Sequence, residues 1–101
     1  MSLVTETVDK NERLIIAMDE KFDFAKVQAF KQAYQAIPEQ VSVVEVNLAK
    51  TEYMDSSALG MLLNMQKSLS HRNIEFKITH CRPQVARILE ISRFDKKFTI
   101  S

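Results

Sequence analysis

Residues 41–63 constrain the fold most, because a strand-like run is followed closely by the start of a helix. Val41 to Leu48 is a largely apolar run and is typical of a buried strand. Asp55-Ser56-Ser57 precedes residues with helical spacing, and Asp55 is a suitable N-cap. The sequence therefore predicts a strand-to-helix junction. In an open α/β sheet such a junction carries free N–H groups and a partial positive charge, so ligands and modified groups gather there.

The remaining periodic segments extend this pattern to the order β-β-α-β-α-β-α. They are a hairpin (Leu3 to Val8 and Arg13 to Met18), a helix from Phe22-Asp23 to Pro38, a strand (Ile74 to Thr79), a helix from Pro83 and a short last strand at Phe98 and Ile100. Strands joined through helices favour right-handed parallel crossovers. We expect a single α/β domain over residues 1–101, with a mixed, mostly parallel sheet of four to five strands and about three to four helices. Whether the helices cover one face or both stays open.

Composition excludes several classes of function. The 14 basic and 13 acidic residues give no strong field for nucleic acid or an anionic membrane. The only glycine, Gly60, cannot form a phosphate-binding P-loop or a dinucleotide fingerprint, so we expect no cofactor. The run Leu14 to Met18 is too short for membrane insertion. The single cysteine, Cys81, cannot form an internal disulfide, which indicates a reducing cytoplasm.

A helical wheel separates the two serines of the junction. Ser57 projects roughly 160° from the middle of the apolar stripe, and Ser56 only about 100° from it. Met61 and Met65 continue the row of Ser57 at spacings of four. We therefore expect Ser57 to face outward beside two methionines that form a partner surface. The stripe expected to face the core contains Leu59, Leu62, Leu63 and Leu69, with Ala58 on its edge.

Simpler interpretations of the same residues remain open. Asp-Ser-Ser is also an ordinary capping sequence, and methionines are often core residues. Catalysis is not expected, because no histidine or lysine is placed by a motif to activate either hydroxyl. His80 and Cys81 are adjacent on a strand end, so their side chains diverge and a shared metal site is not expected.

The nine residues Asp55 to Leu63 resemble the signature of the STAS domain family, of the anti-sigma factor antagonist type, whose usual form is Asp-Ser-Ser-Gly-Leu-Gly. The order of strands and helices extends this resemblance over nearly the whole chain, and Ile91 to Ile100 resembles the closing segment of the family. Two positions depart from the pattern, because Ala58 and Arg93 stand where glycine is common. A partner that approaches the backbone closely at Ala58 would meet its methyl group.

The resemblance implies a bacterial, cytoplasmic regulator of transcription or another output that works by partner switching. In the family the second serine of the motif is phosphorylated, which corresponds to Ser57, and Asp55 and Ser56 present it. The implied partners are a serine kinase that doubles as an anti-sigma-type regulator, and a PP2C-like serine phosphatase. An alternative is a non-switching accessory subunit of a membrane lipid transporter. A less favoured alternative is a small-ligand domain using the strand ends.

Overall fold

The computed structural model describes residues 3–35 and 37–101. Its strands are β1 (Val4–Val8), β2 (Arg13–Ala17), β3 (Lys21–Phe22), β4 (Val43–Asn47), β5 (Tyr53–Met54), β6 (Glu75–Thr79) and β7 (Thr99–Ile100). Its α-helices are α1 (Val27–Gln35), α2 (Ser56–Ser68) and α3 (Pro83–Ile91). Two short 3-10 helices are η1 (Phe24–Lys26) and η2 (Phe94–Lys96). The predicted order of main elements is confirmed.

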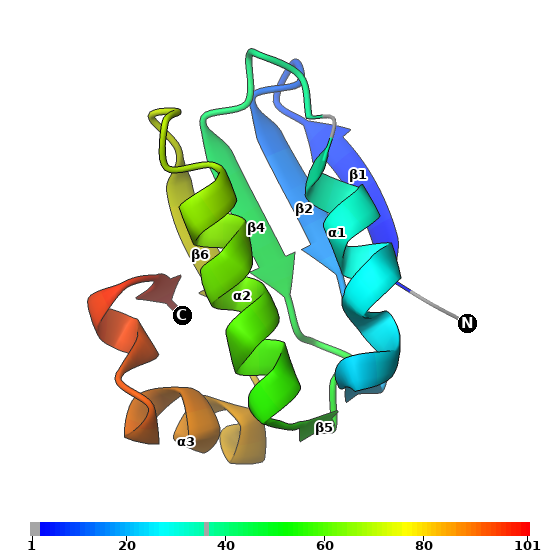
Figure 1. The fold of residues 1–101 in the computed structure, drawn as a ribbon, viewed down its shortest axis with the longest axis vertical. Helices are drawn as coiled ribbons and strands as arrows, with labels where there is room; N and C mark the ends of the chain where they lie inside the picture. The colour runs from blue at the N-terminus through cyan, green and yellow to red at the C-terminus, as the bar shows by residue number, and fades with distance from the viewer. Residues whose placement is uncertain (1–2, 36) are drawn as a thin grey trace.

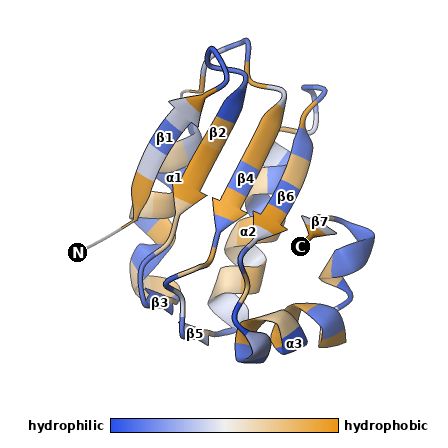
Figure 2. Ribbon diagram, turned by 180° about the vertical axis from the view of Figure 1, so that it is seen from behind, coloured by the Kyte–Doolittle hydropathy of each residue, from blue (hydrophilic) through white to orange (hydrophobic). Residues whose placement is uncertain are grey.

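The main sheet has five strands in the order β1-β2-β4-β6-β7. β1 pairs antiparallel with β2 as the predicted hairpin, and the other neighbours are parallel. Helices α1 and α2 lie against one face of this sheet (Figure 1). Figure 2, drawn from behind, shows the opposite face of the sheet in front of those helices. The described helices therefore leave this face uncovered, which answers the question that the sequence left open.

The core lies between the sheet and helices α1 and α2. Strand register aligns Leu14, Val44 and Phe76 in one row, and Ile16, Val46 and Ile78 in the next. All six side chains are buried. The two helices cover these rows with buried side chains, among them Phe30, Tyr34, Leu62 and Met65. Full burial of one such apolar side chain is worth about 1.5–3 kcal/mol, so these rows fix which face of each helix points inward.

A second, two-stranded sheet was not expected from the sequence. β3 and β5 pair in parallel, with Lys21 opposite Tyr53 and Phe22 opposite Met54. Two residues are too few to show the alternation that identifies a strand, so no sequence pattern marked them. Phe22 and Met54 are nevertheless buried. This pairing ties the chain just before α2 to the chain just before α1.

The turn after α3 shows why glycine is common in the family pattern at the position of Arg93. Arg93 has φ 61° and ψ 33°, in the left-handed region. Residues other than glycine pay roughly 1–2 kcal/mol in this region, because Cβ approaches the following carbonyl oxygen. Glycine is therefore the unstrained residue at this position, and the chain carries arginine there at some cost in stability.

A polar network crosses the uncovered face of the sheet. Arg13 Nη1 donates to Glu45 Oε1 at 2.8 Å, and Thr79 Oγ1 donates to Glu45 Oε2 at 2.7 Å. Burial by itself would raise the pKa of Glu45, but the hydrogen bonds from Thr79 and Arg13 outweigh it, so the pKa is lowered. A lowered pKa means that the ionised carboxylate stabilises the folded state above the ordinary glutamate pKa. That contribution is lost as the pH falls through the lowered value.

We expect Glu45→Gln to lower the free energy of unfolding by about 1–3 kcal/mol at pH 7, because Arg13 loses a charged partner. The gap between the two proteins should shrink as the pH falls through the lowered pKa of Glu45, where the carboxylate of the wild type becomes protonated. Urea unfolding of both proteins at a series of pH values measures this difference in the free energy of unfolding. Exposed Glu39, changed to glutamine, serves as the control. A gap that stays constant with pH would contradict this role of the ionised carboxylate.

Candidate functional site

The start of α2 is capped by the side chain of Asp55. This residue is extended (φ −116°, ψ −175°), and its Oδ1 accepts hydrogen bonds from the N–H groups of Ser57 at 2.9 Å and Ala58 at 3.3 Å. The first N–H groups of a helix have no partner within the helix, and the carboxylate satisfies two of them. The predicted cap and the helix start at Ser56 are therefore confirmed.

The two serine side chains differ in exposure, but in the opposite sense to the expectation. Ser56 is exposed and Ser57 is half-buried. Within the described residues, neither hydroxyl makes a hydrogen bond to the protein. The Asp55 carboxylate accepts hydrogen bonds only from backbone N–H groups here. The Ser57 side chain is thus partly accessible and takes no part in the cap.

The expected partner residues Ala58, Met61 and Met65 lie in the core, so their assignment to an exposed contact surface is wrong. Ala58 and Met65 are fully buried, and Met61 is only 8% exposed. Leu63, which was expected in the core, is 37% exposed. The stripe that faces the sheet consists of Ala58, Met61, Leu62, Met65 and Leu69. These residues follow the helical spacing i, i+3, i+4, i+7 and i+11, and the helix is rotated accordingly.

Exposed apolar side chains also lie on the segments that lead into α2 and α1. Tyr53, two residues before the cap, is 52% exposed, and Phe24 is 75% exposed. The pairing of β3 with β5 brings the segment that leads to Phe24 next to the one that leads to α2 (Figure 1). Along α2 itself, Gly60 and Leu63 follow Ser56 on the exposed side. A helical wheel with its buried side centred on Met61 and Leu62 would have identified Gly60 and Leu63 as exposed. The position of Phe24 relative to α2 could be inferred only from the β3–β5 pairing.

Features of metal sites, reactive thiols and membrane spans are not found in the part of the chain that the structure describes. Residues 3–35 and 37–101 contain no cluster of three metal-ligating side chains. Burial raises the pKa of the Cys81 thiol, which favours its neutral form. Among the described helices, none combines the length and the hydropathy needed to cross a bilayer.

The chain belongs to the STAS domain family, whose model matches residues 2–101. It is 37% identical to a STAS-domain containing protein of Pseudomonas aeruginosa (strain UCBPP-PA14) over 90 residues, which is 89% of each chain. The family resemblance carried by Asp55 to Leu63 is therefore confirmed.

Solved structures show the same fold. The unphosphorylated form of the anti-sigma factor antagonist SpoIIAA has a TM-score of 0.81 at 18% identity, covering 99% of this chain and 88% of that one. The phosphorylated form of Bacillus SpoIIAA has a TM-score of 0.70 at 17% identity, covering 99% and 91%. The STAS domain of a Vibrio cholerae SulP transporter has a TM-score of 0.70 at 22% identity, covering 89% and 70%. At these identities the likeness concerns the fold alone.

We expect Asp55→Ala to lower the free energy of unfolding by about 0.5–2 kcal/mol, because two N–H groups lose their acceptor. Asp55→Asn should retain most of the stability, since its amide oxygen can cap the helix. Ser56→Ala is the matched control at the neighbouring exposed position and should change stability little. Urea unfolding of the three variants measures the differences. Equal stability of Asp55→Ala and the wild type would show that the cap is dispensable.

Proposed function

We propose that the protein is a cytoplasmic anti-sigma factor antagonist-like switch controlled by phosphorylation of Ser57. The unphosphorylated protein binds a serine kinase that acts as an anti-sigma-type regulator, phosphorylation releases it, and a PP2C-like serine phosphatase restores binding. The observation that carries the proposal is the Ser57 hydroxyl, which is partly accessible and makes no hydrogen bond to the described residues in the first turn of a capped helix. The family membership supports the same choice.

Electrostatics favour an effect on binding over an effect on the fold. A phosphate on Ser57 adds about −1.5 to −2 charges. The helix N-terminus would stabilise that charge by about 0.3–1 kcal/mol, and repulsion from the Asp55 carboxylate opposes this gain. Burying the same charge against a partner surface without a matching cation costs several kcal/mol. The cost at the interface is the larger effect, so release of the partner is expected while the helix stays folded.

The proposed docking surface consists of Ser56, the half-buried Ser57, Gly60 and Leu63 on α2 together with Tyr53 and Phe24, and it replaces the methionine surface. Exposed aromatic side chains are enriched at the centres of interfaces, where charged residues are scarce. The nine residues of α1 and the thirteen of α2 contain only two charged side chains, Lys31 and Lys67. The whole chain, by contrast, has 14 basic and 13 acidic residues. The helix layer is therefore suited to contact with a protein.

We expect Ser57→Asp to weaken binding of the kinase partner by about tenfold or more, because a negative charge is placed in the interface. Ser57→Ala should bind like the wild type and should accept no phosphate. The partner is first captured from native cells with the wild-type protein, and affinities are then measured by calorimetry. Ser68→Asp, the same change at the far end of α2, is the control. Equal affinities of Ser57→Asp and the wild type would contradict the proposal.

Gly60 gives independent support to the docking surface. It lies inside α2, where glycine costs roughly 0.5–1 kcal/mol relative to alanine. A Cβ atom built at Gly60 meets nothing within 4 Å, and its φ is not in the left-handed region. Neither packing nor backbone conformation within the chain therefore requires glycine here. Close approach of a partner to the helix backbone would require it.

We expect Gly60→Ala to raise the free energy of unfolding by about 0.5–1 kcal/mol and, at the same time, to weaken partner binding. These opposite effects distinguish a docking role from a structural one. Ser68→Ala, also on the exposed side of α2, should leave binding unchanged. Urea unfolding and calorimetry on the same preparations test both expectations. A variant that is more stable and binds normally would remove Gly60 from the surface.

A second proposed function is that of a non-switching accessory subunit of a membrane lipid transporter, as the family resemblance implies; a STAS domain of the same fold is also part of a SulP transporter. The same face of α2 would then make a permanent contact. Intact-mass measurement of the protein isolated from native cells separates the two functions. The switch requires a population that is heavier by one phosphoryl group, mapped to Ser57. The accessory subunit requires unmodified protein that co-purifies with a transporter ATPase.

A further inference from the structure

A cavity of about 280 Å³ lies at the carboxyl ends of α1 and α2, at the opposite end of α2 from Ser57. Its apolar lining comes from Tyr34 and Ile37 on one side and Leu69 on the other. Three basic residues also line it, namely Lys31, His71 and Arg72, and no acidic residue does. The cavity thus combines an apolar surface with positive charge.

Tyr34 supplies a second, independent feature. The residue is only 8% exposed, and it lines both this cavity and a smaller neighbouring one of about 50 Å³. Its ring packs edge-on against Phe30 at a centroid distance of 5.7 Å. Its hydroxyl makes no hydrogen bond to residues 3–35 or 37–101 and is not sealed from solvent. This hydroxyl reaches solvent without a protein partner, so it is available to donate to a ligand.

The positive charge of the basic residues in this cavity is larger than the negative charge of the two helix ends. Each helix carboxyl end contributes about −0.5 charge, whereas Lys31 and Arg72 each contribute a full positive charge to the cavity. Neither of the two forms an ion pair within the described chain. Arg72 Nη2 donates to the Pro38 carbonyl at 2.7 Å, which leaves other guanidinium N–H groups free. The site therefore keeps a net positive charge that an anion would neutralise.

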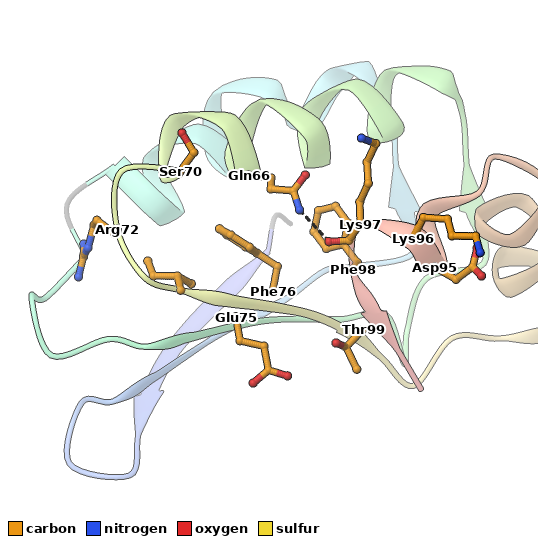
Figure 3. A pocket seen from close by; sticks show the side chains of 11 residues that line it. Gln66, Ser70, Arg72, Glu75, Phe76, Asp95, Lys96, Lys97, Phe98 and Thr99 are labelled. Atoms are coloured by element: carbon orange, nitrogen blue, oxygen red, sulfur yellow. Dashed lines mark hydrogen bonds between the residues drawn. The ribbon is translucent and has the colours of Figure 1, made fainter.

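Another cavity, of about 410 Å³, lacks this combination. It lies between α2, β6 and the segment that leads into β7, and Gln66 bridges it by donating to the Lys97 carbonyl at 2.7 Å (Figure 3). Its lining mixes both signs of charge, because Glu75 and Asp95 offset most of the charge of Lys96, Lys97 and Arg72, the last of which lines both cavities. Figure 3 shows Asp95 and Lys96 close to each other at one end. This cavity gives no preference for an anion.

We propose that the cavity between the carboxyl ends of α1 and α2 binds a small anionic amphiphile, that is, an aliphatic or aromatic body carrying one carboxylate or phosphate. The apolar body contacts Ile37, Leu69 and the Tyr34 ring. The anionic group accepts hydrogen bonds from the Tyr34 hydroxyl and from Lys31 and Arg72. Such a site is separate from the docking surface around Ser57 and does not depend on phosphorylation.

The test is an NMR titration of the full chain with sodium octanoate, and with octyl phosphate in parallel. We expect saturable shifts of the backbone amides in residues 31–35 and 68–72, with a Kd of about 1 mM or tighter for at least one of the two probes. Acetate, which lacks the apolar body, and octanol, which lacks the charge, should bind at least about tenfold more weakly. Binding of acetate or octanol as tight as that of octanoate would overturn the proposal. So would the absence of saturable shifts with both anionic probes.

Variants locate the site. Tyr34→Phe removes only a hydroxyl without a protein partner, so the fold should persist while affinity for octanoate falls about tenfold. Lys31→Gln on the helix surface provides a second variant and should also weaken binding. Lys96→Gln is the matched control, because Lys96 lines the other cavity. Unchanged affinity in both Tyr34→Phe and Lys31→Gln, or weaker binding in Lys96→Gln alone, would overturn the assignment.

Discussion

Contact between the inner face of α2 and the parallel strands is the constraint on which the rest of the structure depends. Met61, Leu62 and Met65 are buried in the core, and they fix the rotation of the helix about its axis. A helix advances by about 100° per residue, so its rotation decides at once which of two adjacent serines is open to solvent. The apolar core therefore controls the geometry of the two serines at the start of α2.

The Asp55 cap does not involve the serine hydroxyls, and the proposed phosphorylation switch requires this independence. Asp55 satisfies the N–H groups of Ser57 and Ala58, so helix stability does not depend on either hydroxyl. A charge added to Ser57 then enters a site where the helix dipole and the carboxylate have opposing effects. In the proposed switch, phosphorylation of Ser57 would change the docking surface while the sheet, the core and the helix layer stay as they are.

The two ends of α2 have different chemistry. The thirteen residues of this helix separate the ends by about 20 Å, since each residue rises 1.5 Å. The amino end carries the cap, the serines and exposed aromatic side chains. The carboxyl end has an apolar cavity lined by basic residues and by the Tyr34 hydroxyl. The proposed docking surface and the proposed anion site are therefore separated by the length of α2, and a partner bound at one would leave the other free.

The sequence by itself determined the order of the main elements, the hairpin, the Asp55 cap and the family, because alternation, helical spacing and capping residues are local signals. Tertiary structure decided the rotation of α2, since Leu63 and Met61 are both apolar and only contact with the sheet shows which one is inside. It also decided the β3–β5 pairing, which brings the chain near Phe24 to the chain near Tyr53. Both outcomes come from contacts between segments distant in sequence, and single-chain periodicity contains no information about such contacts.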